Sequence, residues 1–412
     1  MSILIRNGTI VTQDENRRVM KGDLLIEGDE IAGIGDVGGL ADEVIDATGM
    51  IVMPGLINLH THVSMANLRG IADDVSFDKF LEITYGADAN RSPEEVFKGA
   101  LQGCAEMALT GTTCFLDLYY SEDMVAKAAE QAGLRAFLAW AVLDDDKTTQ
   151  KGSPIENCAR FIREWSGREL ITPVVGPQGV YACSGETLAR ARELAKDNGT
   201  VCHYHLSETR GEVYDLMKRE GSRPIDWLQE IGFLGEGDIA AHSVWITKHE
   251  MIALVESGVS VAHCPTSNMK LAVGGVAPVP EMRQAGGKVG LGTDGCASNN
   301  SLDMFSEMKT CSLLQKHSKW DPAIISAQEV LDMATTEGAK ALGMEAQLGS
   351  LEKGKKADVV LVDARIPGMS PMNASNAVSN LVYSCSGRNV CCTIVNGKIV
   401  ARNGALAGNS TG

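Results

Sequence analysis

Short apolar runs alternate with amphipathic segments through the middle of the chain. Eight of these runs are rich in aliphatic and β-branched residues, which is typical of buried strands. The segments between them carry helix signals; at 92–94, for example, a capping serine precedes a proline at the first helical position. Eight strand–helix repeats predict an α/β protein built around a (β/α)8, TIM-like barrel. The predicted strands cover residues 55–60, 112–118, 135–142, 171–177, 200–206, 239–243, 259–264 and 288–294.

The two ends of the chain share a different pattern. Residues 3–11 and 392–400 are both β-branched runs interrupted by Asn-Gly, which is the strongest short signal for a hairpin. Residues 357–364 add a further predicted strand. We therefore expect a small β-sandwich domain built from both chain termini, with the barrel inserted between its two parts. The predicted limits are 1–53 and 350–412 for the sandwich and 54–349 for the barrel.

Composition narrows the classes of partner. The chain has 412 residues, of which 44% are hydrophobic and 22% charged, as in many globular enzymes. Its net charge of -16 argues against a nucleic-acid or anionic-membrane partner, because both bind basic surfaces. No apolar run approaches the ~20 residues that cross a bilayer, and the N-terminus lacks a signal-peptide pattern. The 11 cysteines form no CxxC pair, which favours reduced, buried thiols and a cytoplasmic location.

Histidine is scarce, with 8 in the chain, yet several histidines stand where predicted strands end. His60 and His62 close the first predicted strand with one residue between them. Residues i and i+2 of a strand point to the same side, so both imidazoles can reach one ion. In a barrel of this type the active site lies at the carboxyl ends of the strands. Further candidates at these ends are His203, His205, Glu208, His242, His263 and Asp294.

A structural role is the alternative for each of these residues taken singly. His203 and His263 favour that alternative when each is considered alone, and His249 and His317 lie in polar, helical surroundings typical of the surface. As a set that converges on one barrel mouth, the histidines and carboxylates are difficult to explain by packing. Imidazole and carboxylate ligands suit Zn²⁺ or Fe²⁺. The sequence therefore predicts a metal site with ionisable groups beside it.

Longer motifs surround these residues. They read PGLINLHTHVSMANLRG, HLSET, AAHSVW, HCPTSNMKL and GLGTDGCASNNSLDMFSEMK. In these motifs the chain resembles the amidohydrolase superfamily, in the branch of deaminases that includes methylthioadenosine/S-adenosylhomocysteine deaminase, guanine deaminase and chloro-s-triazine hydrolases. The resemblance extends over nearly the whole chain, and it includes the flanking β-domain through GSLEKGKKADVVLVD.

The resemblance implies a metal centre of a defined type. One divalent metal, most simply Zn²⁺ with Fe²⁺ as the alternative, is expected on His60, His62, His205 and Asp294. Binuclear members of the superfamily carry a bridging carbamylated lysine on strand four. The corresponding segment here, ITPVVGPQG, has no lysine, which favours a mononuclear centre. The resemblance also implies a dimer or tetramer as the homo-oligomeric state.

The same resemblance implies how the reaction proceeds. Glu208 is expected to carry a proton to the ring nitrogen of the substrate, and His242 is expected to activate the attacking water together with Asp294. The metal lowers the pKa of its water from ~15.7 to ~7, which makes hydroxide available at neutral pH. Attack of this hydroxide on an amidine-like C=N carbon, with proton transfer to the leaving amine, releases ammonia.

The substrate side departs from the methylthioadenosine/S-adenosylhomocysteine deaminase pattern. Gln178 replaces a histidine after strand four, and Ala89, next to Asp88, stands where a ribose-binding glutamate is expected. Two arginines that bind a substrate carboxylate correspond to Trp140 and to the region of 153–154. Trp140 can form an aromatic wall for a flat heterocycle, although packing at the barrel rim is the alternative. The predicted substrate contacts are Gln178, Trp140, Asp88, Ser298 and His263.

The preferred function is hydrolytic deamination of a small amino-heterocycle or amidine-type substrate in the cytoplasm. An adenosine derivative is one alternative, and loss of chloride or an alkylamine from an s-triazine is another. S-Adenosylhomocysteine is expected to be a poor substrate because no arginine is left to pair its carboxylate. A non-catalytic binding barrel is the alternative of a different class, and the complete set of ligand and proton-transfer positions argues against it.

Overall fold

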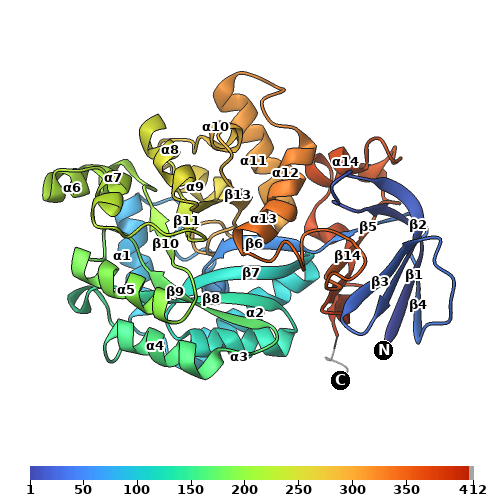
Figure 1. The fold of residues 1–412 in the computed structure, drawn as a ribbon, viewed down its shortest axis with the longest axis horizontal. Coiled ribbons are helices and arrows are strands. Elements are labelled where there is room, and N and C mark those ends of the chain that lie inside the picture. The colour runs from blue at the N-terminus through green and yellow to red at the C-terminus, as the bar shows by residue number, and fades with distance from the viewer. Residues whose placement is uncertain (408–412) are drawn as a thin grey trace.

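The computed structural model describes residues 1–407. Strands from the N-terminal segment and strands from the C-terminal segment meet in one sheet (Figure 1). Its nine strands are β1 Ser2–Val11, β2 Val19–Glu27, β3 Glu30–Gly35, β4 Glu43–Asp46, β5 Met50–Pro54, β14 Val359–Asp363, β15 Val390–Val395, β16 Lys398–Arg402 and β17 Ala405–Leu406. They are ordered β17-β16-β15-β14-β5-β1-β2-β3, with β4 beside β1. The N-terminal and C-terminal segments of this sheet pair through the antiparallel strands β5 and β14, in which Val52 lies opposite Leu361. Residues 408–412, at the end of the predicted segment 350–412, lie outside the described part.

Two four-stranded parallel sheets occupy the middle of the chain. The first contains β6 Leu56–Thr61, β7 Thr112–Tyr119, β8 Arg135–Val142 and β9 Ile171–Pro177. The second contains β10 His203–Leu206, β11 Ile239–His242, β12 Ser260–His263 and β13 Val289–Leu291. All eight predicted strands are present, and nearly every residue in them is buried. This burial agrees with their almost continuous apolar runs, since parallel strands are covered on both faces.

Hydrogen bonds join the two parallel sheets at both edges. The amide of Val175 on β9 donates to the carbonyl of Val201 at 3.1 Å, and Val175 pairs in parallel with Cys202. At the other edge, the amide of Asp294 donates to the carbonyl of His60 at 2.9 Å. The carboxyl ends of the eight strands therefore lie on one side, where the sites of parallel α/β proteins form.

Helices separate successive strands of these sheets and surround them in Figure 1. The helix α2 begins as predicted, because Ser92 and Glu95 form a reciprocal capping box and Pro93 occupies the first turn. No helix within residues 1–407 is long and apolar enough to cross a membrane. The helices are α1 Phe77–Asp88, α2 Pro93–Leu109, α3 Glu122–Ala132, α4 Pro154–Trp165, α5 Gly185–Asp197, α6 Arg210–Glu220, α7 Pro224–Glu230, α8 Lys248–Glu256, α9 Pro265–Lys270, α10 Val279–Gln284, α11 Met304–Lys319, α12 Ala327–Met333, α13 Thr336–Ala341 and α14 Ala377–Tyr383. Four short 3-10 helices, η1 Val63–Leu68, η2 Asp145–Lys147, η3 Pro367–Met369 and η4 Gly387–Asn389, complete the described elements.

Candidate active site

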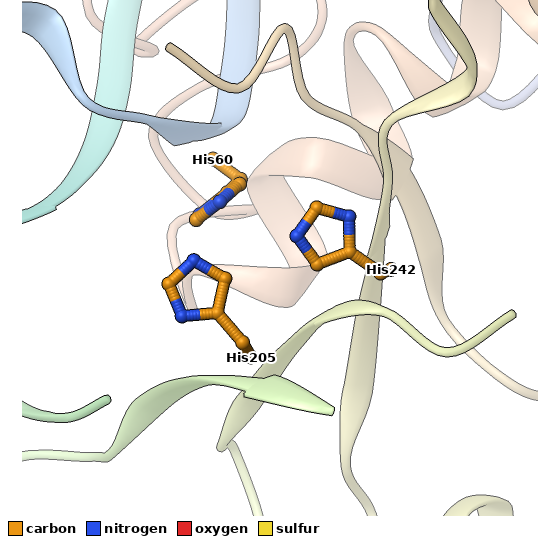
Figure 2. A group of neighbouring side chains, drawn as sticks. All are labelled: His60, His205 and His242. Carbon is orange, nitrogen blue, oxygen red and sulfur yellow. The ribbon is translucent and has the colours of Figure 1, made fainter. Parts of the chain in front are cut away.

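The four predicted metal ligands converge at the carboxyl ends of the parallel strands. Oδ1 of Asp294, just after β13, lies 3.3 Å from Nε2 of His62 and 3.6 Å from Nε2 of His60, both on or beside the end of β6. Nε2 of His205 on β10 lies 3.3 Å from Nε2 of His62. Figure 2 shows the rings of His60, His205 and His242 turned toward one another, and one nitrogen of each lies within 4.8 Å of the others. This arrangement brings three imidazoles and one carboxylate to one point.

The residues at this point fit a divalent metal. Nε2 of His60 is buried and has no hydrogen-bond partner among residues 1–407, although it faces Asp294. Nδ1 of His62 lies 2.6 Å from the carbonyl of Leu118, and Nδ1 of His205 lies 2.7 Å from the carbonyl of Gln178. A carbonyl oxygen only accepts, so Nδ1 of each ring donates its proton to the carbonyl, and Nε2 is the nitrogen that faces the other ligands. Three imidazoles and a carboxylate are ligands that suit zinc.

The carboxylate of Asp294 is held in place by its surroundings. Oδ2 accepts hydrogen bonds from the hydroxyls of Ser267 at 2.6 Å and Ser298 at 3.0 Å, while Oδ1 accepts the amide of Gly295 at 2.7 Å. Burial by itself would raise the pKa of Asp294, but the interactions with the neighbouring histidines outweigh burial and hold that pKa well below its usual value. Asp294 is therefore a carboxylate that faces the imidazoles with Oδ1.

Residues at several of these strand ends have strained backbones. Ser207 after β10, His242 and Ser243 at the end of β11, and Asp294 after β13 all have positive φ, with values of 49°, 73°, 49° and 61°. Positive φ is rare outside glycine and costs energy that the surrounding fold must supply. Such strain is concentrated at functional sites, and here it occurs at the three strand ends that carry Glu208, His242 and Asp294.

Glu208 has the environment of a proton-transfer group. Its side chain is 13% exposed, and Oε2 lies 3.8 Å from Nε2 of His242. Burial, reinforced by the charge of Asp294, raises the pKa of Glu208 to about 8. Its backbone amide is fixed by the carboxylate of Glu212 at 2.9 Å. A carboxyl group with this pKa can hold and release a proton near neutrality, as general acid–base catalysis requires.

His242 is buried beside Glu208 and Asp294. Nδ1 of His242 lies 3.0 Å from the side-chain amide of Asn268 on α9. Burial lowers the pKa of His242 to about 4, so the imidazole is neutral at pH 7. Its Nε2 faces the carboxyl of Glu208, which places a neutral imidazole beside an acidic group.

A cavity of about 290 Å³ opens onto these groups. Three of the predicted substrate contacts, Gln178, Asp88 and Ser298, line its wall. Asp88, at the end of α1, accepts a hydrogen bond from the hydroxyl of Tyr119, and burial raises its pKa. The wall also includes His62, His205, Glu208, His242 and Asp294, so the candidate catalytic groups and the candidate substrate contacts share one cavity.

The structure does not bring Trp140 or His263 into this cavity, which corrects their prediction as wall residues. Trp140 is 4% exposed and packs against Phe161 of α4 with ring centroids 5.7 Å apart, because alternation along β8 turns it toward the helices. Its Nε1 donates to Oε1 of Gln150 at 2.8 Å. His263 is also buried, and its Nε2 lies 3.4 Å from the side-chain amide of Gln315 on α11.

Other residues of the site were not found from the sequence. Asp117 on β7 accepts hydrogen bonds from the hydroxyl of Thr61 and from the amide of Val63 at 2.6 Å, and it thereby holds the strand end that carries His60 and His62. The aromatic-rich segment that forms α1 was the available signal for the wall residues of that helix. Those missed in the wall include Phe77, Phe80, Leu81, Tyr85, Tyr119, Tyr120, Lys147, Gln150 and Tyr181.

Comparisons with known proteins agree with the predicted resemblance. The model of the amidohydrolase family matches residues 51–400. A 5'-deoxyadenosine deaminase of Methanothermobacter thermautotrophicus is 43% identical over 98% of this chain and 94% of its own length. A 5-methylthioadenosine/S-adenosylhomocysteine deaminase of Moorella thermoacetica is 43% identical over 98% of this chain and 95% of its own length. The crystal structure of an adenosine deaminase from Xanthomonas campestris with bound zinc superposes with a TM-score of 0.94 at 32% identity, covering 99% of this chain and 95% of the other.

Proposed function

The chain belongs to the amidohydrolase family, and we propose that it removes the ring amino group of an adenosine derivative by hydrolysis. The relatives named above act on this class of compound, which favours the adenosine alternative over triazines and small amidines. The single observation that carries the proposal is the shared cavity, which places Asp88 in the same wall as Glu208 and the histidines. Oδ1 of Asp88 accepts hydrogen bonds from Tyr119 and Arg91, so Oδ2 is the oxygen that we propose accepts a ribose hydroxyl.

The proposed reaction uses the residues of this chain as follows. His60, His62, His205 and Asp294 would hold a zinc ion, which when bound would lower the pKa of water toward ~7 and so supply the nucleophile. Glu208 takes up a proton and delivers it to the ring nitrogen beside the carbon that is attacked. The neutral Nε2 of His242 lies beside Glu208, where it can hydrogen-bond the attacking oxygen or pass a proton to the departing amine. Ser267 and Ser298 keep Asp294 oriented while protons move.

The outer part of the cavity favours a short, apolar group at the 5' position of the nucleoside. Its wall contains Phe77, Phe80, Leu81, Leu143 and Leu271. Apart from the histidines, the lining residues include one basic side chain, and it is Lys147. Nζ of Lys147 already donates to the carbonyl of Tyr181 at 3.1 Å. We therefore propose 5'-deoxyadenosine and methylthioadenosine as better substrates than S-adenosylhomocysteine, whose charged tail would find one partly engaged lysine.

Ammonia release by the zinc-loaded protein tests this function. We expect kcat/KM for 5'-deoxyadenosine and methylthioadenosine to exceed that for S-adenosylhomocysteine by about tenfold or more, since each unpaired buried charge is costly. The panel also contains adenosine, guanine and an s-triazine. A triazine or guanine as the best substrate contradicts the proposal, and S-adenosylhomocysteine as the best substrate contradicts its 5' preference.

The proposal also covers the closure of the barrel and the form of the terminal sheet. We infer that the eight parallel strands close into a TIM-like barrel at residues 54–349 and that the sheet of 1–53 and 350–412 folds into a sandwich. The edge hydrogen bonds of Val175 and Asp294 support closure of the barrel. The homo-oligomeric state and the cytoplasmic location stay predictions.

A further inference from the structure

An imidazole that binds a metal does so through one ring nitrogen. The hydrogen-bond partner of the other ring nitrogen decides which of the two carries the proton. For His62 and His205 that partner is a backbone carbonyl, as described above. His60 differs, because its Nδ1 lies 2.9 Å from Nε2 of another histidine, His203. The partner of His60 could donate or accept, so its own environment decides which nitrogen of His60 carries the proton.

His203 is fully buried on β10, two residues before His205 and therefore on the same side of the strand. Its Nδ1 lies 2.9 Å from the carbonyl oxygen of Ile239 on β11. A carbonyl oxygen only accepts, so the single proton of a neutral His203 ring is on Nδ1. Nε2 of His203 is then an acceptor, and the proton between the two histidines must belong to Nδ1 of His60.

We infer that His203 is a positioning residue that holds His60 in the tautomer protonated on Nδ1. Nε2 of His60 is thereby left without a proton. This nitrogen is buried, has no hydrogen-bond partner among residues 1–407 and lies 3.6 Å from Oδ1 of Asp294. A free lone pair at this position faces the expected metal. The inference rests on the proposed metal site, and it is independent of the proposed substrate.

The chain of contacts explains why a histidine is used at position 203. It runs from the carbonyl of Ile239 on β11 through His203 on β10 to His60 on β6. His60 is the ligand whose ring is fully buried, and the partner of its Nδ1 is a side chain on another strand. An imidazole can donate with one nitrogen and accept with the other, so it spans the distance and transmits the polarity of the carbonyl. An aliphatic residue of similar size would fill the space but leave Nδ1 of His60 without an acceptor.

The test compares two variants of similar shape, His203→Met and His203→Gln. The amide oxygen of glutamine can accept the proton of His60, whereas the thioether of methionine is a weak acceptor. We expect His203→Met to raise the zinc dissociation constant by about 10- to 100-fold, the usual effect of losing an outer partner of a ligand. His203→Gln is expected to recover most of that loss. Zinc affinity is measured by competition with a chelating dye, which does not depend on turnover.

A matched control is His263→Met, which replaces another fully buried histidine on the neighbouring strand β12 without touching the cavity. Its zinc dissociation constant is expected to stay within about twofold of the parent, because no outer partner of a ligand is lost. Parent-like zinc binding by His203→Met overturns the inference. Equal losses in His203→Met and His203→Gln, or in His203→Met and His263→Met, overturn it as well, because they indicate general packing.

A second measurement applies if the variants at 203 do not fold. Long-range ¹H–¹⁵N spectra of the metal-free parent, labelled at histidine, report which nitrogen of His60 carries the proton. A proton on Nδ1 supports the inference, and a proton on Nε2 overturns it. A protein that shows the expected tautomer and zinc affinities but releases no ammonia from adenosine derivatives contradicts the proposed function alone.

Discussion

The inner and outer ends of the cavity are built in different ways. The inner end consists of residues at or directly after parallel strands, namely His60, His62, His205, His242 and Asp294, and each is fixed by a close hydrogen-bonding partner. The outer end consists of α1 and the segment 143–150, and its wall includes the half-exposed Tyr85. Rigid strand ends suit chemistry that tolerates little displacement, whereas helices and loops can vary with the substrate. Changes at the inner end should therefore abolish turnover, and changes at the outer end should redistribute it among substrates.

The largest expected effect is the loss of a ligand at the inner end. In His62→Ala the zinc content should fall to a small fraction of the parent value, because one of four ligands and its fixed lone pair are removed. Turnover should fall by more than the ~100-fold that follows loss of an outer partner of a ligand. Elemental analysis and ammonia release measure the two quantities. Full zinc content in this variant would remove His62 from the metal site.

The next effect separates proton transfer from metal binding. Glu208→Gln should keep its zinc but lose about 10²- to 10⁴-fold in kcat, because the amide cannot carry the proton. Glu220→Gln, on the exposed end of α6, is the matched control and should resemble the parent. Rates are measured on the best substrate of the panel. A Glu208→Gln protein within about threefold of the parent would show that another group transfers the proton.

A change at the outer end should depend on the substrate. Asp88→Asn removes the charge that we propose binds a ribose and should lower kcat/KM for 5'-deoxyadenosine by about 10- to 100-fold, the usual cost of one charged hydrogen bond. The kcat/KM for free adenine, which lacks the ribose, should change by less than about threefold. The ratio of the two kcat/KM values measures the effect. Equal losses on both substrates would assign Asp88 to the structure of the cavity.

The smallest expected effect concerns Trp140, which supports the outer wall from behind. Trp140→Phe removes the hydrogen bond to Gln150, and the free energy of unfolding should fall by about 0.5–1.5 kcal/mol. For every substrate, the kcat/KM of Trp140→Phe should stay within about threefold of the parent value. Trp165→Phe is the control, since Trp165 also packs against Phe161, whereas the hydrogen bond to Gln150 comes from Trp140. A selective loss of heterocycle binding in Trp140→Phe would restore the predicted aromatic wall.

The convergence of the residues at the inner end could be predicted from the sequence because strand geometry is local. Residues i and i+2 of a strand share a face, so His60 and His62 could be paired from their spacing alone. Parallel strands also bring their carboxyl ends together, so the sequence predicts His205, His242 and Asp294 in one group. The recognised motifs around these residues then supplied roles that spacing alone could not.

The tertiary structure alone decided the side-chain partners and the outer wall. Trp140 has the chemistry of a stacking residue, but its position on β8 turns it toward Phe161 of α4, a contact that depends on helix packing. Asp88 reaches the cavity only because α1 lies across the strand ends, and no periodicity in the sequence predicts that placement. The pairing of His203 with His60 joins residues 143 positions apart in the chain. The sequence by itself determined which chemical groups stand at the strand ends, whereas long-range packing determined which of them share a proton or a cavity, because those contacts form only when distant segments fold together.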